Sequence, residues 1–172
     1  LTQKSNSSPR IKRTELMVRL RGLEEWAGDN GYDKALFITL TAPSKYHSHN
    51  TKGFQNVRWN YSNPRMVSEY FNGVWSRVRA DLKRKNVQYF GVRVAEPHHD
   101  GCPHWHLLVF AGSGNDALQV EASIHAYGLA EDGTEKGAKK RRVTVVDIDG
   151  EEGSAVGYIA KYIAKNIDGG NL

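Results

Sequence analysis

Apolar residues recur along the chain at two different spacings, which separate predicted helices from predicted strands. A spacing of three or four residues is typical of amphipathic helices, and short runs rich in β-branched and aromatic residues are typical of strands. The predicted helices cover residues 12–27, 64–85, 115–127 and 153–167. The predicted strands cover residues 35–43, 88–95, 104–110 and 143–148.

The order of these elements is helix, strand, helix, strand, strand, helix, strand, helix. A short polar segment joins the two middle strands, which predicts an antiparallel hairpin. The inner six elements follow the β-α-β-β-α-β order of ferredoxin-like folds. We therefore predict an α+β fold: a ferredoxin-like (RRM-like) central antiparallel sheet with helices packed on it.

Two segments lack a clear hydrophobic period and are expected to be loops. Residues 44–63 are rich in His, Asn, Ser and Gly, and a loop of this length in a compact domain is usually functional or mobile. Residues 132–142 are charged, contain glycines and end in the basic run Lys139 to Arg142. We interpret that run either as a track for a nucleic-acid backbone or as a solvated loop.

Composition narrows the class of protein without identifying it. The chain has 172 residues, 39% hydrophobic and 25% charged, which suits one globular domain. With a mean hydropathy of −0.60, it has no apolar run near the roughly 18 residues of a membrane helix, so no membrane partner is expected. A single cysteine excludes an intrachain disulfide and suits a cytoplasmic protein. The formal charge of +5 favours polyanionic partners.

The strand at 104–110 contains a candidate metal site. His104 and His106 are two residues apart, so both imidazoles point to one face of the sheet. Glu96 ends the preceding strand, and the hairpin brings it back beside His104. A metal held by one carboxylate and two imidazoles keeps coordination positions open for water and phosphate oxygens, as a catalytic metal needs. This ligand set suits Mg²⁺ or Mn²⁺. The rivals for the third ligand are the turn residues His98, His99 and Asp100, and the simplest alternative is a pair of surface histidines.

The last predicted helix contains candidate nucleophiles. Tyr158 and Tyr162 are four residues apart and share one helix face, while Lys161 and Lys165 repeat that spacing on an adjacent face. A tyrosine can attack a phosphodiester and hold the product covalently. The alternative is an amphipathic helix with tyrosines at the edge of the core and solvated lysines.

Three segments taken together resemble a known family. They are FITLTAPSKYH (37–47), AEPHHDGCPHWHLLVF (95–110) and YIAKYIAKNID (158–168). In order and spacing they are similar to the motifs of the HUH (histidine–hydrophobe–histidine) endonucleases of rolling-circle replication. The similarity is greatest to the replication gene A proteins of tailed bacteriophages and prophages. The chain is thus expected to be a single HUH endonuclease domain, residues 1–172, excised from a longer replication initiator.

The resemblance implies a role for each candidate residue. Glu96, His104 and His106 would bind a divalent metal ion, and Tyr158 and Tyr162 would cleave single-stranded DNA at a replication origin. The products would be a 5′-phosphotyrosine and a free 3′-OH, while Lys161 and Lys165 would hold phosphate or stabilise charge. A monomer is expected, and a host helicase and polymerase are candidate partners that the sequence does not identify.

Other functions stay open on the residues alone. A metal-dependent hydrolase would use activated water and leave the tyrosines structural. A non-catalytic nucleic-acid-binding module would need no metal. An HUH relaxase or transposase is a neighbouring interpretation of the same motifs. For DNA contacts, the sequence suggests base stacking on exposed aromatic residues of the long loop, such as Tyr46, Trp59 and Tyr61.

Overall fold

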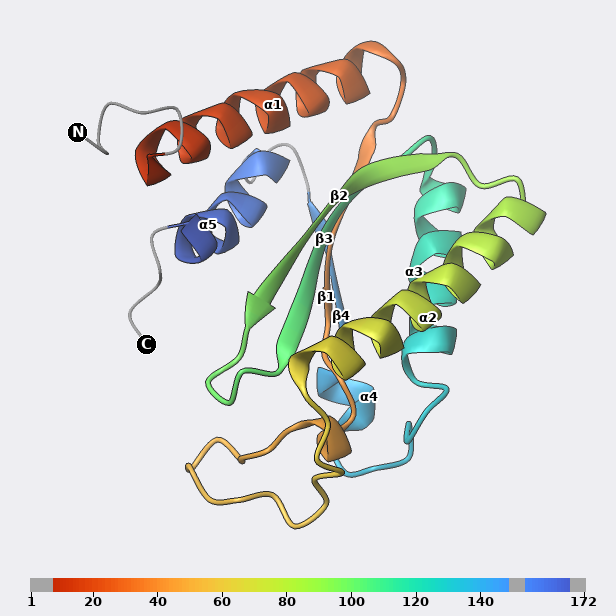
Figure 1. Cartoon of the computed structure of the whole chain (residues 1–172). Coiled ribbons are helices and arrows are strands. Elements are labelled where there is room, and N and C mark those ends of the chain that lie inside the picture. Colours follow the sequence, from red (N-terminus) through yellow and green to blue (C-terminus); the bar gives the residue numbers. More distant parts are fainter. Residues whose placement is uncertain (1–7, 149–153, 168–172) are drawn as a thin grey trace.

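The predicted order of helices and strands is present in the computed structural model, which describes residues 8–148 and 154–167 (the last four by their backbone alone). The elements, labelled in Figure 1 where there is room, are α1 (Pro9–Asp29), β1 (Lys34–Leu40), the short 3-10 helix η2 (Ser44–Tyr46), α2 (Pro64–Arg84), β2 (Tyr89–Pro97), β3 (Pro103–Ala111), α3 (Gly114–Gly128), α4 (Ala138–Arg141), β4 (Val143–Ile148) and α5 (Ala155–Ile167).

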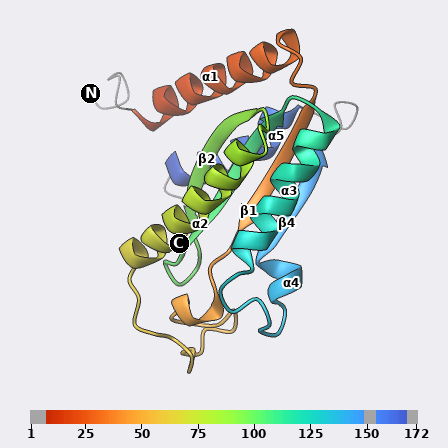
Figure 2. The same cartoon turned by 90° about the vertical axis from the view of Figure 1, so that its right-hand side faces the viewer.

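The four strands form one antiparallel sheet in the order β2-β3-β1-β4. This is the strand order that the β-α-β-β-α-β sequence of ferredoxin-like folds produces, so the predicted fold class is confirmed. Side chains alternate between the two faces of each strand. In Figure 1 and Figure 2, α2 and α3 lie on one side of the sheet, and α1 and α5 lie on the other.

Each face of the sheet has its own hydrophobic core. The core under α2 and α3 includes Leu36, Ile38 and Leu40 of β1 with Trp105, Leu107 and Val109 of β3. The core under α1 and α5 includes Phe37 of β1, Leu108 and Phe110 of β3, and Ile159 of α5. Because apolar residues occupy both faces of β1 and β3, the central strands are fixed between two layers of helices.

Side-chain caps explain where the predicted helices begin. The Ser8 side chain accepts a hydrogen bond from the Ile11 amide, and Asn63 does the same for Met66, each just before a proline at the first helical position. The Ser113 side chain accepts from the Asp116 amide at the start of α3. α1 is longer at both ends than the predicted helix of residues 12–27.

Two short helices differ from the sequence prediction. The expected loop at 44–63 begins with η2, and the expected charged loop at 132–142 ends in the four-residue helix α4. A single helical turn has too few residues to show a hydrophobic period, so the sequence pattern cannot predict either one. Among the described residues, no helix is both long and apolar enough to span a membrane.

Candidate metal centre and tyrosine helix

The hairpin of β2 and β3 positions the carboxylate and the two histidines that the sequence singles out. Glu96 is the cross-strand partner of His104, and Val94 is the partner of His106. Glu96, His104 and His106 therefore lie on the face covered by α5. Trp105 points to the opposite face and is buried against Phe71 of α2, with ring centroids 5.0 Å apart.

His106 is held from both ring nitrogens. Its Nε2 lies 2.8 Å from Glu96 Oε2, and its Nδ1 lies 3.1 Å from the Thr39 hydroxyl of β1. The ring stacks on Tyr162 with centroids 3.7 Å apart, and Phe37 lies on it at 5.7 Å. At 4% exposure, His106 is buried, so hydrogen bonds and stacking fix the orientation of its ring.

His104 lies in a second cluster, together with histidines from the turn and from the loop after β1. Its ring stacks on His98 at 4.6 Å, and His47 approaches both rings edge-on, 5.8 Å from His104 and 5.5 Å from His98. His104 Nε2 and His98 Nδ1 are buried and have no hydrogen-bond partner among the described residues. Nitrogen donors of His47, His98 and His104 all lie within 4.8 Å of one another.

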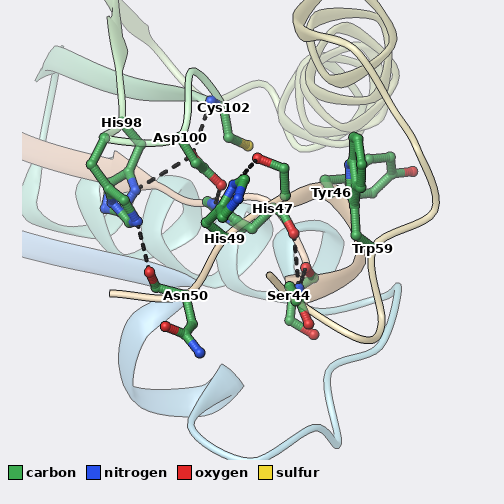
Figure 3. A network of polar contacts seen from close by, with 12 residues as sticks. Ser44, Tyr46, His47, His49, Asn50, Trp59, His98, Asp100 and Cys102 are labelled. Atoms are coloured by element: carbon green, nitrogen blue, oxygen red, sulfur yellow. Dashed lines mark hydrogen bonds and ion pairs between the residues drawn. The ribbon is translucent and has the colours of Figure 1, made fainter. Parts of the chain in front are cut away.

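Asp100 organises the turn that carries this cluster. Its Oδ2 lies 3.1 Å from His47 Nδ1, its Oδ1 accepts a hydrogen bond from the Cys102 amide, and His98 Nδ1 lies 3.6 Å from Oδ1. Figure 3 shows His47 and His98 lying close to Asp100. The carboxylate thus ties the loop after β1 to the β2–β3 turn.

Protonation states in the cluster follow from burial. Burial, with the neighbouring imidazoles of His98 and His47, lowers the pKa of His104 to about 4. Burial also lowers the pKa of His98. It raises the pKa of the Cys102 thiol to about 12. At neutral pH the two imidazoles are therefore uncharged, the form in which histidine binds a metal, whereas Cys102 is a protonated thiol.

The residues present fit a divalent metal. Two donors that bind one ion at about 2.1 Å lie roughly 3 to 3.5 Å apart, close to the 2.8 Å between His106 Nε2 and Glu96 Oε2. The partnerless Nε2 of His104 is a further donor on the same face. Among the described residues, however, the donor atoms within 4.8 Å of one another join His104 to His47 and His98, not to Glu96 and His106. Of the rivals considered for the third ligand, His98 and Asp100 lie beside His104, and His99 Nε2 lies 3.1 Å from the Asn50 carbonyl.

The tyrosine helix α5 covers this face of the sheet. Tyr162 stacks on Phe37 at 5.4 Å as well as on His106, and Tyr158 lies 5.9 Å from Phe37. Lys161 Nζ is 4.9 Å from the centre of the Tyr162 ring. The side chain of Lys165 is outside the described residues. Both tyrosines are half-buried against the core, so they lie near His106 and also contribute to packing.

A network of salt bridges and hydrogen bonds between side chains connects the loop after β1 to the segment around α4. Arg142 is 2% exposed and pairs with Glu135, whose carboxylate also accepts hydrogen bonds from the amide and the hydroxyl of Ser44. Tyr46 is half-buried and donates its hydroxyl to Glu131. Two suggestions from the sequence are therefore wrong: Arg142 is not available to track a DNA backbone, and Tyr46 is not an exposed stacking residue.

The remaining loop aromatics differ in exposure. Tyr61 is 77% exposed, as expected, whereas Trp59, which was also expected to be exposed, is half-buried. The centroids of the two rings are 4.8 Å apart. Beside the histidine cluster, a cavity of about 430 Å³ is lined by residues of the loop after β1, of the β2–β3 turn and of α4, among them His47, His98, His104, Lys136 and Arg141. The histidines thus border a hollow that also has cations on its wall.

Sequence reasoning missed two residues that contact the predicted site. His47 ends the segment FITLTAPSKYH, so it belongs to a recognised motif, but nothing in a structureless loop predicts which side chain returns to the sheet. Thr39 faces His106 because β1 pairs with β3. The alternation of β1 places Thr39 on the face of Phe37, a signal that could have found it once the strand pairing was known.

The fold and the site define the chain as an α+β domain of ferredoxin-like topology whose helix-covered face carries a histidine-rich cluster able to bind a metal. The family model described as bacteriophage replication gene A protein (GPA) matches residues 1–170. The chain therefore belongs to the bacteriophage replication gene A protein family, as its motifs indicated.

Individual relatives agree with this assignment. The "Replication protein" of Haemophilus phage HP1 is 49% identical over 166 residues, 96% of this chain and 21% of that protein. The "Replication gene A protein" of Escherichia phage 186 is 48% identical over 168 residues, 96% of this chain and 24% of that protein. The "Probable replication endonuclease from prophage-like region" of Salmonella paratyphi A is 39% identical over 169 residues, 98% of this chain and 21% of that protein. The chain thus spans a quarter or less of the length of these relatives, and no solved structure matches it.

Proposed function

We propose that this chain is the HUH endonuclease domain of a replication initiator. It would nick single-stranded DNA at a replication origin and transfer the strand, through a covalent 5′-phosphotyrosine. The observation that carries the proposal is the contact of Tyr162 with His106, whose Nε2 in turn lies 2.8 Å from Glu96. A candidate nucleophile and two candidate metal ligands are therefore in contact, although they come from α5, β2 and β3. A relative named as a probable replication endonuclease also supports the proposal.

Glu96, His104 and His106 are the proposed ligands of Mg²⁺ or Mn²⁺. A divalent ion bound there would supply positive charge to a phosphate oxygen of the DNA. In the uncharged form of the His106 ring, Nε2 donates a hydrogen bond to the Glu96 carboxylate and Nδ1 accepts one from the Thr39 hydroxyl. Thr39 therefore sets the orientation of the ring and can accept from Nδ1 when Nε2 binds a metal.

Tyr158 and Tyr162 are the proposed nucleophiles. The phenolic oxygen would form a bond to phosphorus, and the bond from phosphorus to the 3′ oxygen would break. The phenolic proton would leave the tyrosine, and the departing oxygen would take up a proton to give the free 3′-OH. Lys161, whose Nζ lies 4.9 Å from the centre of the Tyr162 ring, would hold phosphate or stabilise charge near the metal site, and Lys165 has the same proposed role. Two tyrosines permit two successive transfers that conserve the bond energy.

One observation favours a second candidate, a hydrolase that activates water. Tyr158 and Tyr162 are packed against Phe37 in the core under α5, as purely structural tyrosines would be. In that case Glu96, His104 and His106 would still bind metal, but no covalent adduct would form. Membership of the replication gene A family favours the tyrosine mechanism in a replication initiator over a relaxase or transposase.

Covalent capture of DNA separates the two candidates. The substrates are labelled single-stranded oligonucleotides that tile the genome encoding the chain, incubated with Mg²⁺ or Mn²⁺ and analysed on denaturing SDS gels. The proposal expects a metal-dependent protein–DNA band that is lost in the variant Tyr158→Phe/Tyr162→Phe. Each single change identifies the tyrosine that cleaves first.

The matched control is Tyr127→Phe, which removes a phenolic hydroxyl from α3 on the opposite side of the sheet and should leave the band unchanged. Cleavage that persists in the double variant without a covalent band would replace the proposal by the hydrolase. Loss of the adduct in the Tyr127 control would mean that the assay reports folding.

A further inference from the structure

Three imidazoles converge from two separate segments, and the proposed nicking mechanism uses only one of them, His104. His47 comes from the loop after β1, His98 from the β2–β3 turn and His104 from β3. We infer that His47, His98 and His104 form a binding site for a late first-row divalent cation such as Zn²⁺ or Co²⁺, distinct from the Glu96–His106 pair.

The positions of the donor atoms support a shared ion. One donor atom from each histidine lies within 4.8 Å of the other two, and ligands of a zinc-like ion lie roughly 3 to 3.5 Å apart. Side-chain movements of about an ångström would bring all three to binding distance. Such movement is open to His47 and His98, because both belong to loop segments rather than to strands.

Unsatisfied polar atoms point to a ligand. Buried polar groups nearly always have hydrogen-bond partners, and one without a partner requires an explanation such as an ion. Nε2 of His104 and Nδ1 of His98 are both buried and have no such partner in the described ranges. A cation bound between the rings would satisfy both nitrogen atoms at once.

Asp100 orients the third ligand. Its carboxylate accepts a hydrogen bond from His47 Nδ1, so the lone pair for a metal is on Nε2 of that ring. This pairing of a carboxylate with a metal-binding histidine recurs in zinc sites, where it fixes the tautomer. Asp100 also accepts from the Cys102 amide, which holds the carboxylate itself in place.

The donor set determines which metals the site prefers. Three imidazoles suit Zn²⁺, Co²⁺, Ni²⁺ or Cu²⁺, whereas Mg²⁺ prefers oxygen ligands. The cavity of about 430 Å³ beside the cluster gives an ion access and leaves room for a fourth ligand. Because His104 is shared, a late metal in this site would compete with a metal held by Glu96 and His106.

The binding test needs neither DNA nor tyrosine chemistry, so it is independent of the proposed nuclease activity. Co²⁺ is titrated into the 172-residue chain while the visible absorption of the bound ion is recorded. His47→Ala and His98→Ala should each weaken binding by about tenfold or more, and Asp100→Asn should weaken it through His47. The remote His125→Ala should bind Co²⁺ as the unchanged chain does, and Glu96→Gln and His106→Ala should weaken Co²⁺ binding less than His47→Ala and His98→Ala do.

Circular dichroism identifies any variant that does not fold. A second measurement needs no variant at all and tests the site if that happens. X-ray absorption of the unchanged chain loaded with one equivalent of Zn²⁺ should show three imidazole ligands. A shell of two imidazoles with carboxylate oxygens would overturn the inference. So would Co²⁺ binding that is lost in Glu96→Gln and His106→Ala but retained in folded His47→Ala and His98→Ala.

Discussion

Thr39 of β1 hydrogen-bonds the proposed metal ligand His106, with 3.1 Å between its hydroxyl and Nδ1. Replacing it by valine keeps the shape and removes the hydrogen bond. We expect Thr39→Val to weaken Mn²⁺ binding and to lower adduct formation by about 10- to 100-fold, the usual effect of losing a partner that orients a ligand. Calorimetric titration with Mn²⁺ and the SDS gel assay measure the two effects.

Thr39→Ser tests whether the hydroxyl is responsible. Serine restores the hydroxyl without the methyl group, so it should recover most of the binding and of the adduct, while a packing role of the methyl group would leave it impaired. Equal activity of Thr39→Val and the unchanged chain would show that His106 needs no partner on Nδ1.

The surroundings of Glu135 predict how the stability of the fold depends on pH. Burial alone would raise its pKa, but hydrogen bonds from Ser44 and the charge of Arg142 outweigh it and lower the pKa of this carboxyl. A carboxylate with a lowered pKa contributes stability above its ordinary pKa, and that contribution is lost as pH falls through the folded-state value. Glu135→Gln should therefore cost about 1 to 3 kcal/mol in free energy of unfolding at pH 7 and progressively less below pH about 4.5.

Urea unfolding at pH 7 and at pH 4 measures this difference. Glu69→Gln is the matched control, because the Glu69 side chain is 63% exposed and pairs with Arg65 on the surface of α2, where an ion pair contributes at most about 1 kcal/mol. A Glu135→Gln cost that does not change with pH would contradict the assignment of the lowered pKa.

The residue pattern predicted some members of the site and could not predict others. Glu96 and His104 followed from the hairpin, because cross-strand pairing is fixed once the turn is placed. His47 and His98 did not, since their meeting depends on how a twenty-residue segment folds back over the sheet. No local period encodes that contact. Burial of Arg142 was equally hidden, because its partner Glu135 lies in a segment without regular structure.

At the scale of elements, the hairpin of β2 and β3 depends on a close approach at Gly91. A Cβ at this position would lie 2.0 Å from the backbone carbonyl oxygen of Leu108 on β3, and a backbone atom in the central sheet cannot move away cheaply. Gly91→Ala should therefore destabilise the chain by several kcal/mol and separate Glu96 from His104. Thermal unfolding, with a Co²⁺ or Mn²⁺ titration of the folded fraction, measures both effects.

Gly73 in the middle of α2 is the matched control for this substitution. It is exposed, and a Cβ there would meet nothing within 4 Å. Alanine is the better helix former by about 1 kcal/mol, so Gly73→Ala should stabilise the chain. If both alanine variants shifted the melting temperature in the same direction, the steric argument for Gly91 would be wrong.

Element order was predictable from the sequence because each long element repeats its period several times. The strand order β2-β3-β1-β4 then follows from the ferredoxin-like connection rules. The short helices η2 and α4 could not be predicted, since each is held by tertiary contacts. Ser44 in η2 is fixed by Glu135, and α4 leads directly into Arg142, which pairs with the same carboxylate.

At the scale of the whole molecule, paired substitutions can distinguish the effect of cations near the histidine cluster from the effect of the overall charge of +5. Lys136 and Arg141 line the cavity that contains His47, His98 and His104. Lys83 and Arg84 end α2 at the far end of that helix from the loop of residues 44–63. The two pairs carry the same charge, one beside the histidine cluster and the other at the end of α2, which makes them matched variants.

If single-stranded DNA runs past the histidine cluster, each contact of a cation with a phosphate releases a counterion. Lys136→Ala/Arg141→Ala should then weaken binding of a labelled oligonucleotide. It should also make the slope of log affinity against log salt concentration less steep by about 1.4, the value for two phosphates of a single strand. Lys83→Ala/Arg84→Ala removes the same charge and should change neither quantity appreciably, because exposed charges beyond a Debye length of about 10 Å are screened. Fluorescence anisotropy across a salt series measures both variants. Equal losses would mean that DNA responds only to net charge, and a loss confined to the α2 pair would place the DNA path at the opposite end of the sheet.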